Sequence, residues 1–66
     1  MKSYSSREII GRLTAEGWYE VGQRGSHMQF KHRTKPGRVT VPHPGKDISL
    51  ATLKSIFRQA GMKPPR

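Results

Sequence analysis

The fold is decided by residues 18–42, which read WYEVGQRGSHMQFKHRTKPGRVTVP. Apolar and polar residues alternate in three short runs, which predicts strands over residues 18–23, 26–33 and 38–42. Arg24-Gly25 can close a tight hairpin between the first two strands. Because arginine adopts a positive φ poorly, a longer or bulged loop is also compatible. Thr-Lys-Pro-Gly at positions 34–37 is typical of a turn before the third strand.

A two-residue loop at Arg24-Gly25 and a four-residue loop at residues 34–37 predict a register in which every pair except the one with His32 is wholly apolar. The predicted pairs are Val21 with Met28, Tyr19 with Phe30, Phe30 with Val41, and His32 with Val39. One face of the sheet is then apolar. The opposite face carries Glu20, His27, Gln29, Lys31, Arg38 and Thr40, with Gly22 directly opposite His27.

Helices are predicted on both sides of this stretch. Ser5 and Glu8 have the spacing of a capping box, which predicts a helix over about residues 6–16. Ser49 can cap a second helix, whose apolar stripe is Leu50, Leu53, Ile56, Phe57 and Ala60 and which ends at Gly61. We therefore expect an α+β fold, helix–three-stranded antiparallel sheet–helix, with both helices on the apolar face. This is the element order of a double-stranded-RNA-binding domain.

The chain is short and strongly basic. Its 66 residues contain no cysteine, and 13 Lys and Arg against four Asp and Glu give a net charge of +9. We expect one domain, ordered over about residues 5–61, with a frayed tail at residues 63–66. No apolar stretch approaches the length of a membrane span or resembles a secretion signal, so we expect a cytoplasmic protein.

The positive charge is concentrated in the middle of the chain, because residues 21–46 contain no Asp or Glu. That segment holds Arg24, Lys31, Arg33, Lys35, Arg38 and Lys46, together with His27, His32 and His43. A basic excess of this size predicts a polyanionic partner. Nucleic acid is the first candidate, and an anionic membrane and an acidic protein are the others.

His27 is the best-placed acid–base group on the predicted polar face. It lies near Arg24 and Lys31, and the missing side chain of Gly22 across the sheet leaves room for a substrate. Histidine can take a proton from a ribose 2′-OH at neutral pH, and Arg24 or Lys31 would stabilise the charge that develops on phosphorus. The residue pattern alone nevertheless favours an ordinary surface histidine.

The other candidates have less distinct roles. His32 falls on the core face, where a structural role is expected, and His43 either contacts phosphate or is simply exposed. Tyr19, Phe30 and Phe57 fit the core, whereas Tyr4 and Trp18 pack in the core or stack on bases, with packing favoured. The residues expected to contact RNA are Arg24, Gly25, Ser26, Lys31, Arg38, His43 and Lys46. No metal site and no cofactor is expected, since no acid or cysteine joins the histidines of the basic segment.

An ordered set of short motifs along nearly the whole chain, from about Ser5 to Gly61, resembles the HicA toxins, also called YcfA-like proteins. The motifs are Gly17-Trp18, Gly25-Ser26-His27, Phe30-Lys31-His32, Val39-Thr40-Val41-Pro42-His43-Pro44, Lys46-Asp47, Leu53-Lys54-Ser55-Ile56 and Gln59-Ala60-Gly61. One departure is Ser49, where many relatives have a proline. Serine is a good helix cap, so the predicted helix is unaffected.

The resemblance implies a fold like that of double-stranded-RNA-binding domains and metal-independent cleavage of mRNA. It also implies neutralisation by a HicB antitoxin, and it identifies His27 as the catalytic histidine. The main alternative is a noncatalytic RNA-binding module that uses the same basic sheet. A DNA regulator is less favoured, because neither predicted helix is basic enough to read a major groove.

Overall fold

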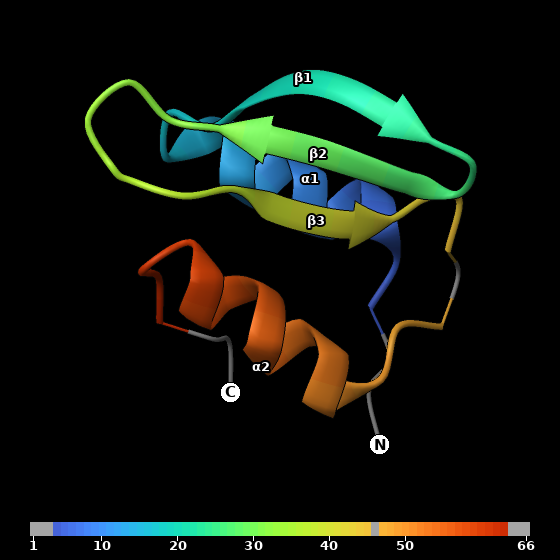
Figure 1. Cartoon of the computed structure of the whole chain (residues 1–66). Coiled ribbons are helices and arrows are strands. Elements are labelled where there is room, and N and C mark those ends of the chain that lie inside the picture. Colours follow the sequence, from blue (N-terminus) through green and yellow to red (C-terminus); the bar gives the residue numbers. More distant parts are fainter. Residues whose placement is uncertain (1–3, 46, 64–66) are drawn as a thin grey trace.

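The computed structural model describes residues 4–45 and 47–63 of the chain. The elements in order are α1 (Ser6–Ala15), β1 (Tyr19–Arg24), β2 (His27–Lys31), β3 (Val39–Pro42) and α2 (Leu50–Gln59). The strands form one antiparallel sheet in the order β1-β2-β3. Helix α1 crosses one face of this sheet and α2 runs beside β3 (Figure 1). The predicted α+β fold, with its resemblance to double-stranded-RNA-binding domains, is confirmed.

Helix α1 begins at the predicted capping box. Ser5 Oγ accepts a hydrogen bond from the Glu8 backbone N–H at 3.2 Å, and Glu8 Oε1 accepts one from the Ser5 N–H at 3.3 Å. Both bonds satisfy donors that the first helical turn leaves unpaired. The helix ends next to Gly17, whose φ of 96° is a conformation that glycine adopts readily.

Helix α2 begins at Ser49, whose Oγ accepts a hydrogen bond from the Thr52 N–H at 3.2 Å. Its predicted apolar stripe is largely confirmed, because Leu53, Ile56, Phe57 and Ala60 are buried. Leu50 is the exception and is 39% exposed at the first position of the helix. Of the tail predicted to be frayed, residues 64–66 lie outside the described residues.

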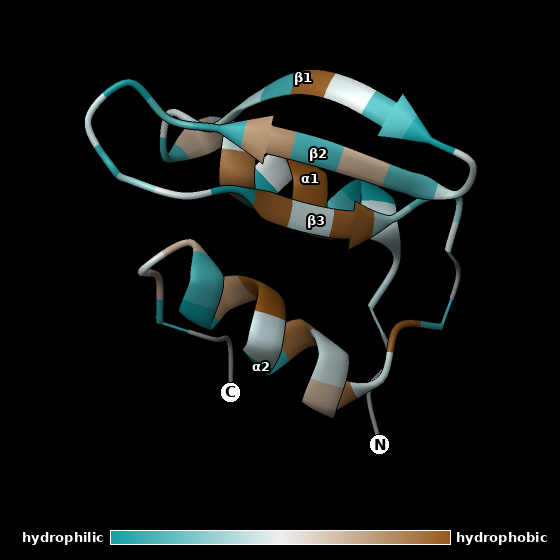
Figure 2. Ribbon diagram, viewed as in Figure 1, coloured by the Kyte–Doolittle hydropathy of each residue, from teal (hydrophilic) through white to brown (hydrophobic). Residues whose placement is uncertain are grey.

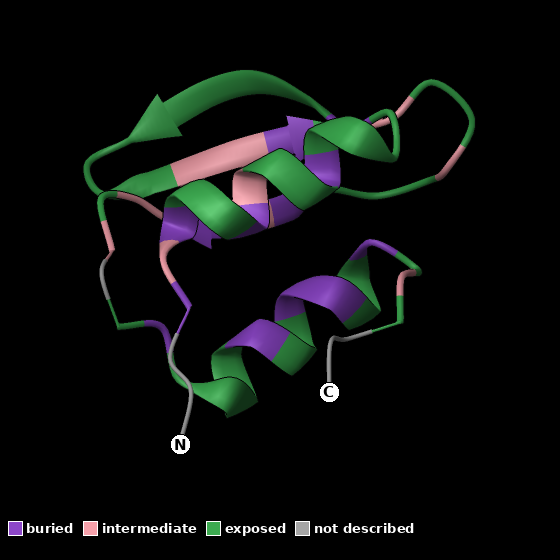
Figure 3. Ribbon diagram, turned by 180° about the vertical axis from the view of Figure 1, so that it is seen from behind, coloured by how far each residue is buried: buried purple, intermediate pink, exposed green. Residues whose placement is uncertain are grey.

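A single hydrophobic core lies between the sheet and the two helices. It consists of Tyr4, Ile9, Leu13, Trp18, Phe30, Val39, Val41, Ile48, Leu53, Ile56, Phe57 and Ala60. Apolar residues recur along β3 (Figure 2), and buried positions recur along both helices (Figure 3). Tyr4 and Trp18 are 4% and 1% exposed, so core packing is confirmed for both. No described helix has the length and apolar character needed to cross a membrane.

The predicted register of the sheet is wrong by two residues in both hairpins. The tight turn is Gly25-Ser26, so Arg24 pairs with His27 and Gln23 with Met28. Gly25 has a φ of 54°, and glycine takes that conformation more easily than the Arg24 of the predicted turn. Between β2 and β3, Phe30 pairs with Val39 and not with Val41. Because side chains alternate with a period of two, this shift leaves each residue of β2 and β3 on its predicted face.

Strand β1 departs from the prediction further, because the register shifts by one residue between Glu20 and Gly22. Tyr19 therefore pairs with Lys31, and Gly22 pairs with Gln29 instead of His27. The extra residue in β1 reverses the alternation of its side chains. Residues before the bulge therefore lie on the opposite face from the one predicted. Tyr19 and Val21, both predicted to be in the core, are 48% and 43% exposed, and every residue of β1 is exposed (Figure 3).

Candidate functional site

His27 is the first residue of β2 and is exposed on the face of the sheet that the helices leave uncovered, termed the outer face below. It lies at the beginning of the central strand, between Arg24 of β1 and Pro42 of β3. Directly opposed side chains of antiparallel strands lie on the same face, so the Arg24 guanidinium and the His27 imidazole share the outer face. The residue opposite His27 on β1 is therefore Arg24 and not the predicted Gly22.

The turn that precedes His27 is held by two hydrogen bonds. Gln23 Nε2 donates to the Gly25 carbonyl at 3.1 Å, and the His43 backbone N–H donates to the Ser26 carbonyl at 2.6 Å. The second bond connects the β1–β2 turn to the loop that follows β3. The turn that precedes His27 is therefore held from two directions, by one side-chain donor and one backbone donor, although the His27 side chain is exposed.

Two other residues predicted to contact RNA, Arg38 and Lys31, lie on the outer face further along β2 from His27. Arg38 Nη1 donates to Gln29 Oε1 at 2.8 Å, which fixes the guanidinium over the middle of the strand. Lys31 is exposed at the end of the strand, four residues after His27 and on the same face. The structure thus brings Arg24, His27, Arg38 and Lys31 together on one surface. Lys46 lies outside the described residues.

His43 is half-buried and turned toward the start of α1. Its Nδ1 is hydrogen-bonded to Ser6 Oγ at 2.7 Å, and Ser6 Oγ also accepts from the Gly45 N–H at 3.0 Å. The Ser6 N–H donates to the Gly45 carbonyl at 2.8 Å. Ser6 is only 2% exposed, so these bonds join α1 to the loop after β3 inside the protein. Contact of His43 with RNA remains a prediction.

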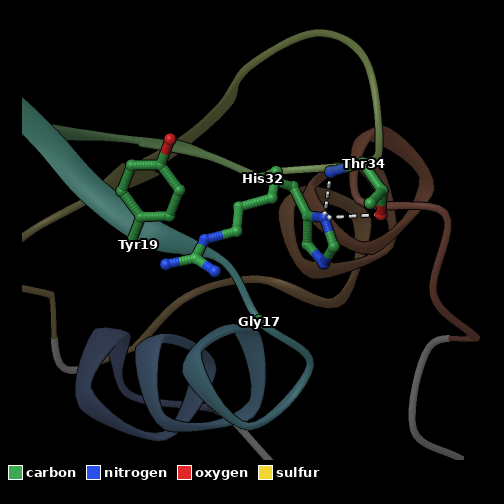
Figure 4. Close-up of a pocket in the computed structure, with 5 residues that line it drawn as sticks. Gly17, Tyr19, His32 and Thr34 are labelled. Carbon is green, nitrogen blue, oxygen red and sulfur yellow. Dashed lines mark hydrogen bonds between the residues drawn. The ribbon is translucent and has the colours of Figure 1, made fainter.

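His32 has the structural role expected from its position on the core side. Its Nδ1 accepts a hydrogen bond from the backbone N–H of Thr34 at 3.1 Å (Figure 4). It accepts another from the backbone N–H of Lys35 at 3.3 Å. Nε2 must therefore carry the ring proton, and it donates to the Glu16 carbonyl at 2.9 Å. The ring also meets Trp18 edge-on, with centroids 5.2 Å apart. His32 thus connects the end of α1 to the loop that follows β2.

An open pocket of about 700 Å³ lies beside His32, at the end of the sheet where β1 begins and β2 ends. Its lining residues are Gly17, Tyr19, His32, Arg33 and Thr34. Figure 4 shows Tyr19 on one side of the pocket and His32 with Thr34 on the other. Sequence reasoning missed this site because it assigned Tyr19 to the core. The longer or bulged loop considered at Arg24-Gly25 gave no signal of it, because the bulge lies within β1, between Glu20 and Gly22.

Metal-ligating side chains do not gather in the part of the chain that the structure describes. No group of three or more His, Asp or Glu residues there is close enough to hold a metal ion.

Comparison with known proteins identifies the family of the chain. The model of one protein family, described as "HicA toxin of bacterial toxin-antitoxin", matches residues 6–62. The chain belongs to the HicA toxin family. The match includes both helices, the whole sheet and the turn before His27, so the resemblance seen in the motifs is confirmed for this HicA protein.

Solved structures give the same result, whereas a search of curated proteins found no match. A chain of a "HicA3 and HicB3 toxin-antitoxin complex" is 32% identical to this HicA protein, with a TM-score of 0.82. That match covers 94% of this chain and 100% of the other. A chain of a "Toxin-Antitoxin complex from Streptococcus pneumoniae" is 29% identical, with a TM-score of 0.75 and coverage of 88% and 97%.

Proposed function

We propose that this HicA protein is an mRNA interferase, an endoribonuclease toxin that cuts RNA in the cytoplasm without a metal ion. The observation that carries the proposal is the position of His27, exposed on the outer face and directly across the ladder from Arg24. An acid–base group beside a cation is an arrangement that can support cleavage by a ribose 2′-OH. Membership of the HicA family supports the same activity.

In the proposed reaction, His27 takes the proton of the 2′-OH on the nucleotide before the cut. The freed oxygen attacks the adjacent phosphorus and forms a bond to it, and the bond from phosphorus to the 5′ oxygen breaks. That oxygen leaves with a proton supplied by the imidazolium or by water. The products are a 2′,3′-cyclic phosphate and a 5′-hydroxyl. Arg24 stabilises the additional negative charge on the phosphorane while it exists.

The cations of the outer face bind the RNA backbone in this account. Arg38 lies over the middle of β2 through its hydrogen bond to Gln29, and Lys31 is exposed at the end of the strand. Backbone atoms of Gly25 and Ser26 lie at the turn beside His27, where they would contact the RNA. Contact of His43 and Lys46 with RNA is proposed from the sequence alone. Phosphate contacts of this kind position a strand and carry no base specificity.

An acidic HicB-like antitoxin is the proposed protein partner. Two solved structures similar to this chain are of toxin–antitoxin complexes. A protein that covers the outer face would block His27 and neutralise the cations around it, and complementary charge would make its association fast and salt-dependent. Coexpression with a HicB-like protein encoded beside the toxin should restore growth and give a complex that copurifies. Continued toxicity and no copurification would contradict this assignment.

The mechanism is tested with two RNAs of the same sequence, one of which has deoxyribose at the scissile position. The ribose substrate should be cut in the presence of EDTA and leave a cyclic phosphate, and the deoxy substrate should remain intact. Inhibition by EDTA, or cutting of the deoxy substrate, would contradict the mechanism. Tight binding of both RNAs with no cutting of either would favour a noncatalytic RNA-binding module.

A further inference from the structure

We propose that the pocket lined by Tyr19 and Arg33 binds one nucleobase of the RNA substrate by stacking on the Tyr19 ring. The proposal rests on the proposed function in that its ligand is the RNA that His27 cuts. It assigns a second subsite on the same molecule, at the opposite end of β2 from His27.

Tyr19 is the one aromatic side chain placed to meet a ligand. The other four aromatic residues, Tyr4, Trp18, Phe30 and Phe57, are at most 4% exposed, whereas Tyr19 is 48% exposed. Its pairing with Lys31 puts the ring on the outer face, beside a lysine already expected to contact phosphate. A half-exposed aromatic ring forgoes part of the free energy that its burial would give. A ligand that covers the Tyr19 ring would therefore be stabilised by burying it.

The wall of the pocket formed by Gly17 and His32 is held in place without a ligand. His32 is fixed by its hydrogen bonds to the backbone of Glu16, Thr34 and Lys35. Gly17 contributes no side chain, and a Cβ there would lie 2.8 Å from His32 Nε2. This wall therefore costs little to order on binding. The volume of about 700 Å³ is within the usual range for ligand pockets, about 300–1,000 Å³.

The chemistry of the pocket fits single-stranded RNA. Single-strand sites in proteins combine an aromatic ring for the base with cations for the backbone, and Tyr19 with Arg33 and Lys31 supplies both. Arginine can also stack on a base through its planar guanidinium. A segment of the antitoxin is the competing occupant of the pocket. An acidic segment would pair with the cations, but that pairing gives no reason for the exposed Tyr19 ring.

The position of the pocket sets its distance from the cut. Four residue steps separate His27 from Lys31 along β2, which is about 14 Å at the usual strand rise. Stacked nucleotides are spaced by about 3.4 Å, so the base in the pocket is at most about four nucleotides from the scissile bond. An extended strand would shorten that count. RNA too short to reach the pocket should therefore be insensitive to Tyr19.

The test uses the Y19A and Y19F variants, with Val21→Ala as a control because Val21 is exposed on the same strand and does not line the pocket. Affinity is measured for an RNA of about ten nucleotides that has deoxyribose at the scissile position, so that binding is read without cutting. Y19A should weaken binding by about 5- to 150-fold, the effect of losing one base stack, whereas Y19F and V21A should bind as the wild type does.

Cleavage provides the second measurement. Y19A should lower kcat/KM on the long RNA and leave cleavage of a dinucleotide unchanged, since a dinucleotide does not reach the pocket. Equal effects of Y19A on long and short RNA would overturn the proposal, and so would a Y19A affinity for RNA equal to that of the wild type. If the RNA affinity is unchanged and antitoxin binding is weakened, the pocket is assigned to the antitoxin. If the wild type binds RNA and never cuts it, the proposed function fails, while the affinity of Y19A still tests the pocket.

Discussion

At the scale of single residues, the contact between Gly17 and His32 explains why these two types occur together. The His32 ring bonds to the Glu16 carbonyl and lies where any side chain at position 17 would begin. The backbone φ of 96° at Gly17 also disfavours every other residue. The histidine and the glycine therefore serve the junction of α1 with the sheet, and the proposed function assigns the chemistry to His27.

Gly17→Ala should destabilise the protein by about 1–3 kcal/mol, because the new Cβ adds backbone strain and a clash at 2.8 Å with His32 Nε2. In a domain of this size, 1 kcal/mol corresponds to a change in Tm of about 4–8 °C. Thermal melts followed by circular dichroism measure the difference.

Gly11→Ala is the matched control. Gly11 lies within α1, and a Cβ there would meet nothing within 4 Å. Alanine favours a helix over glycine, so Tm should stay the same or rise. Equal Tm values for the two alanine variants would show that His32 does not constrain position 17.

At the scale of elements, Ser6 joins the beginning of α1 to the loop after β3, and this loop also holds the turn before His27. Ser6→Ala removes the hydroxyl and leaves the Gly45 N–H and His43 Nδ1 without that partner. Unpaired buried polar groups cost about 1–3 kcal/mol, so Tm should fall clearly. We also expect slower RNA cleavage by the folded variant, because the His43 N–H anchors the Ser26 carbonyl.

The control for this prediction is Ser55→Ala, since Ser55 is exposed on α2 and its hydroxyl accepts a single long hydrogen bond from Gln59 Nε2, at 3.5 Å. Its Tm and cleavage rate should match those of the wild type. A Ser6→Ala variant that melts and cuts as Ser55→Ala does would mean that the α1–loop junction contributes nothing to the site.

The strands also show which parts of the fold and of the candidate site could be predicted from the sequence. The faces of β2 and β3 were predictable, and with them the exposure of His27, because both register errors were of two residues and preserve the alternation. The face of Tyr19 was not predictable. Its alternation with Val21 reads the same with or without a bulge, so only pairing with β2 reveals that Tyr19 meets Lys31. The roles of Ser6 and His43 depend on contacts between residues 37 positions apart, which no local pattern records.

At the scale of the whole molecule, the net charge of +9 predicts that RNA binding depends steeply on salt. Each phosphate contact releases counterions, so for single-stranded RNA the slope of log affinity against log salt changes by about 0.7 per contact. Lys31→Ala should reduce the magnitude of the slope by about that amount. Lys54→Ala, an equal loss of charge on the exposed side of α2, should change it little.

Titration of a noncleavable RNA at several salt concentrations measures these slopes. Affinity that stays flat between low and physiological salt would contradict a polyanion-binding surface. Equal slopes for the two lysine variants would mean that the outer face is not where the phosphates lie.

The central claim is that His27 performs the chemistry, and the most direct test is the RNA cleavage rate of purified His27→Ala. The rate should fall by about a hundred- to ten-thousand-fold, the usual contribution of a general acid or base. Tm and RNA affinity should be nearly unchanged, because the side chain is exposed and the cations supply most of the binding. Lys54→Ala should cut at the wild-type rate. A His27→Ala protein that melts normally, binds RNA and still cuts at the wild-type rate would contradict the account.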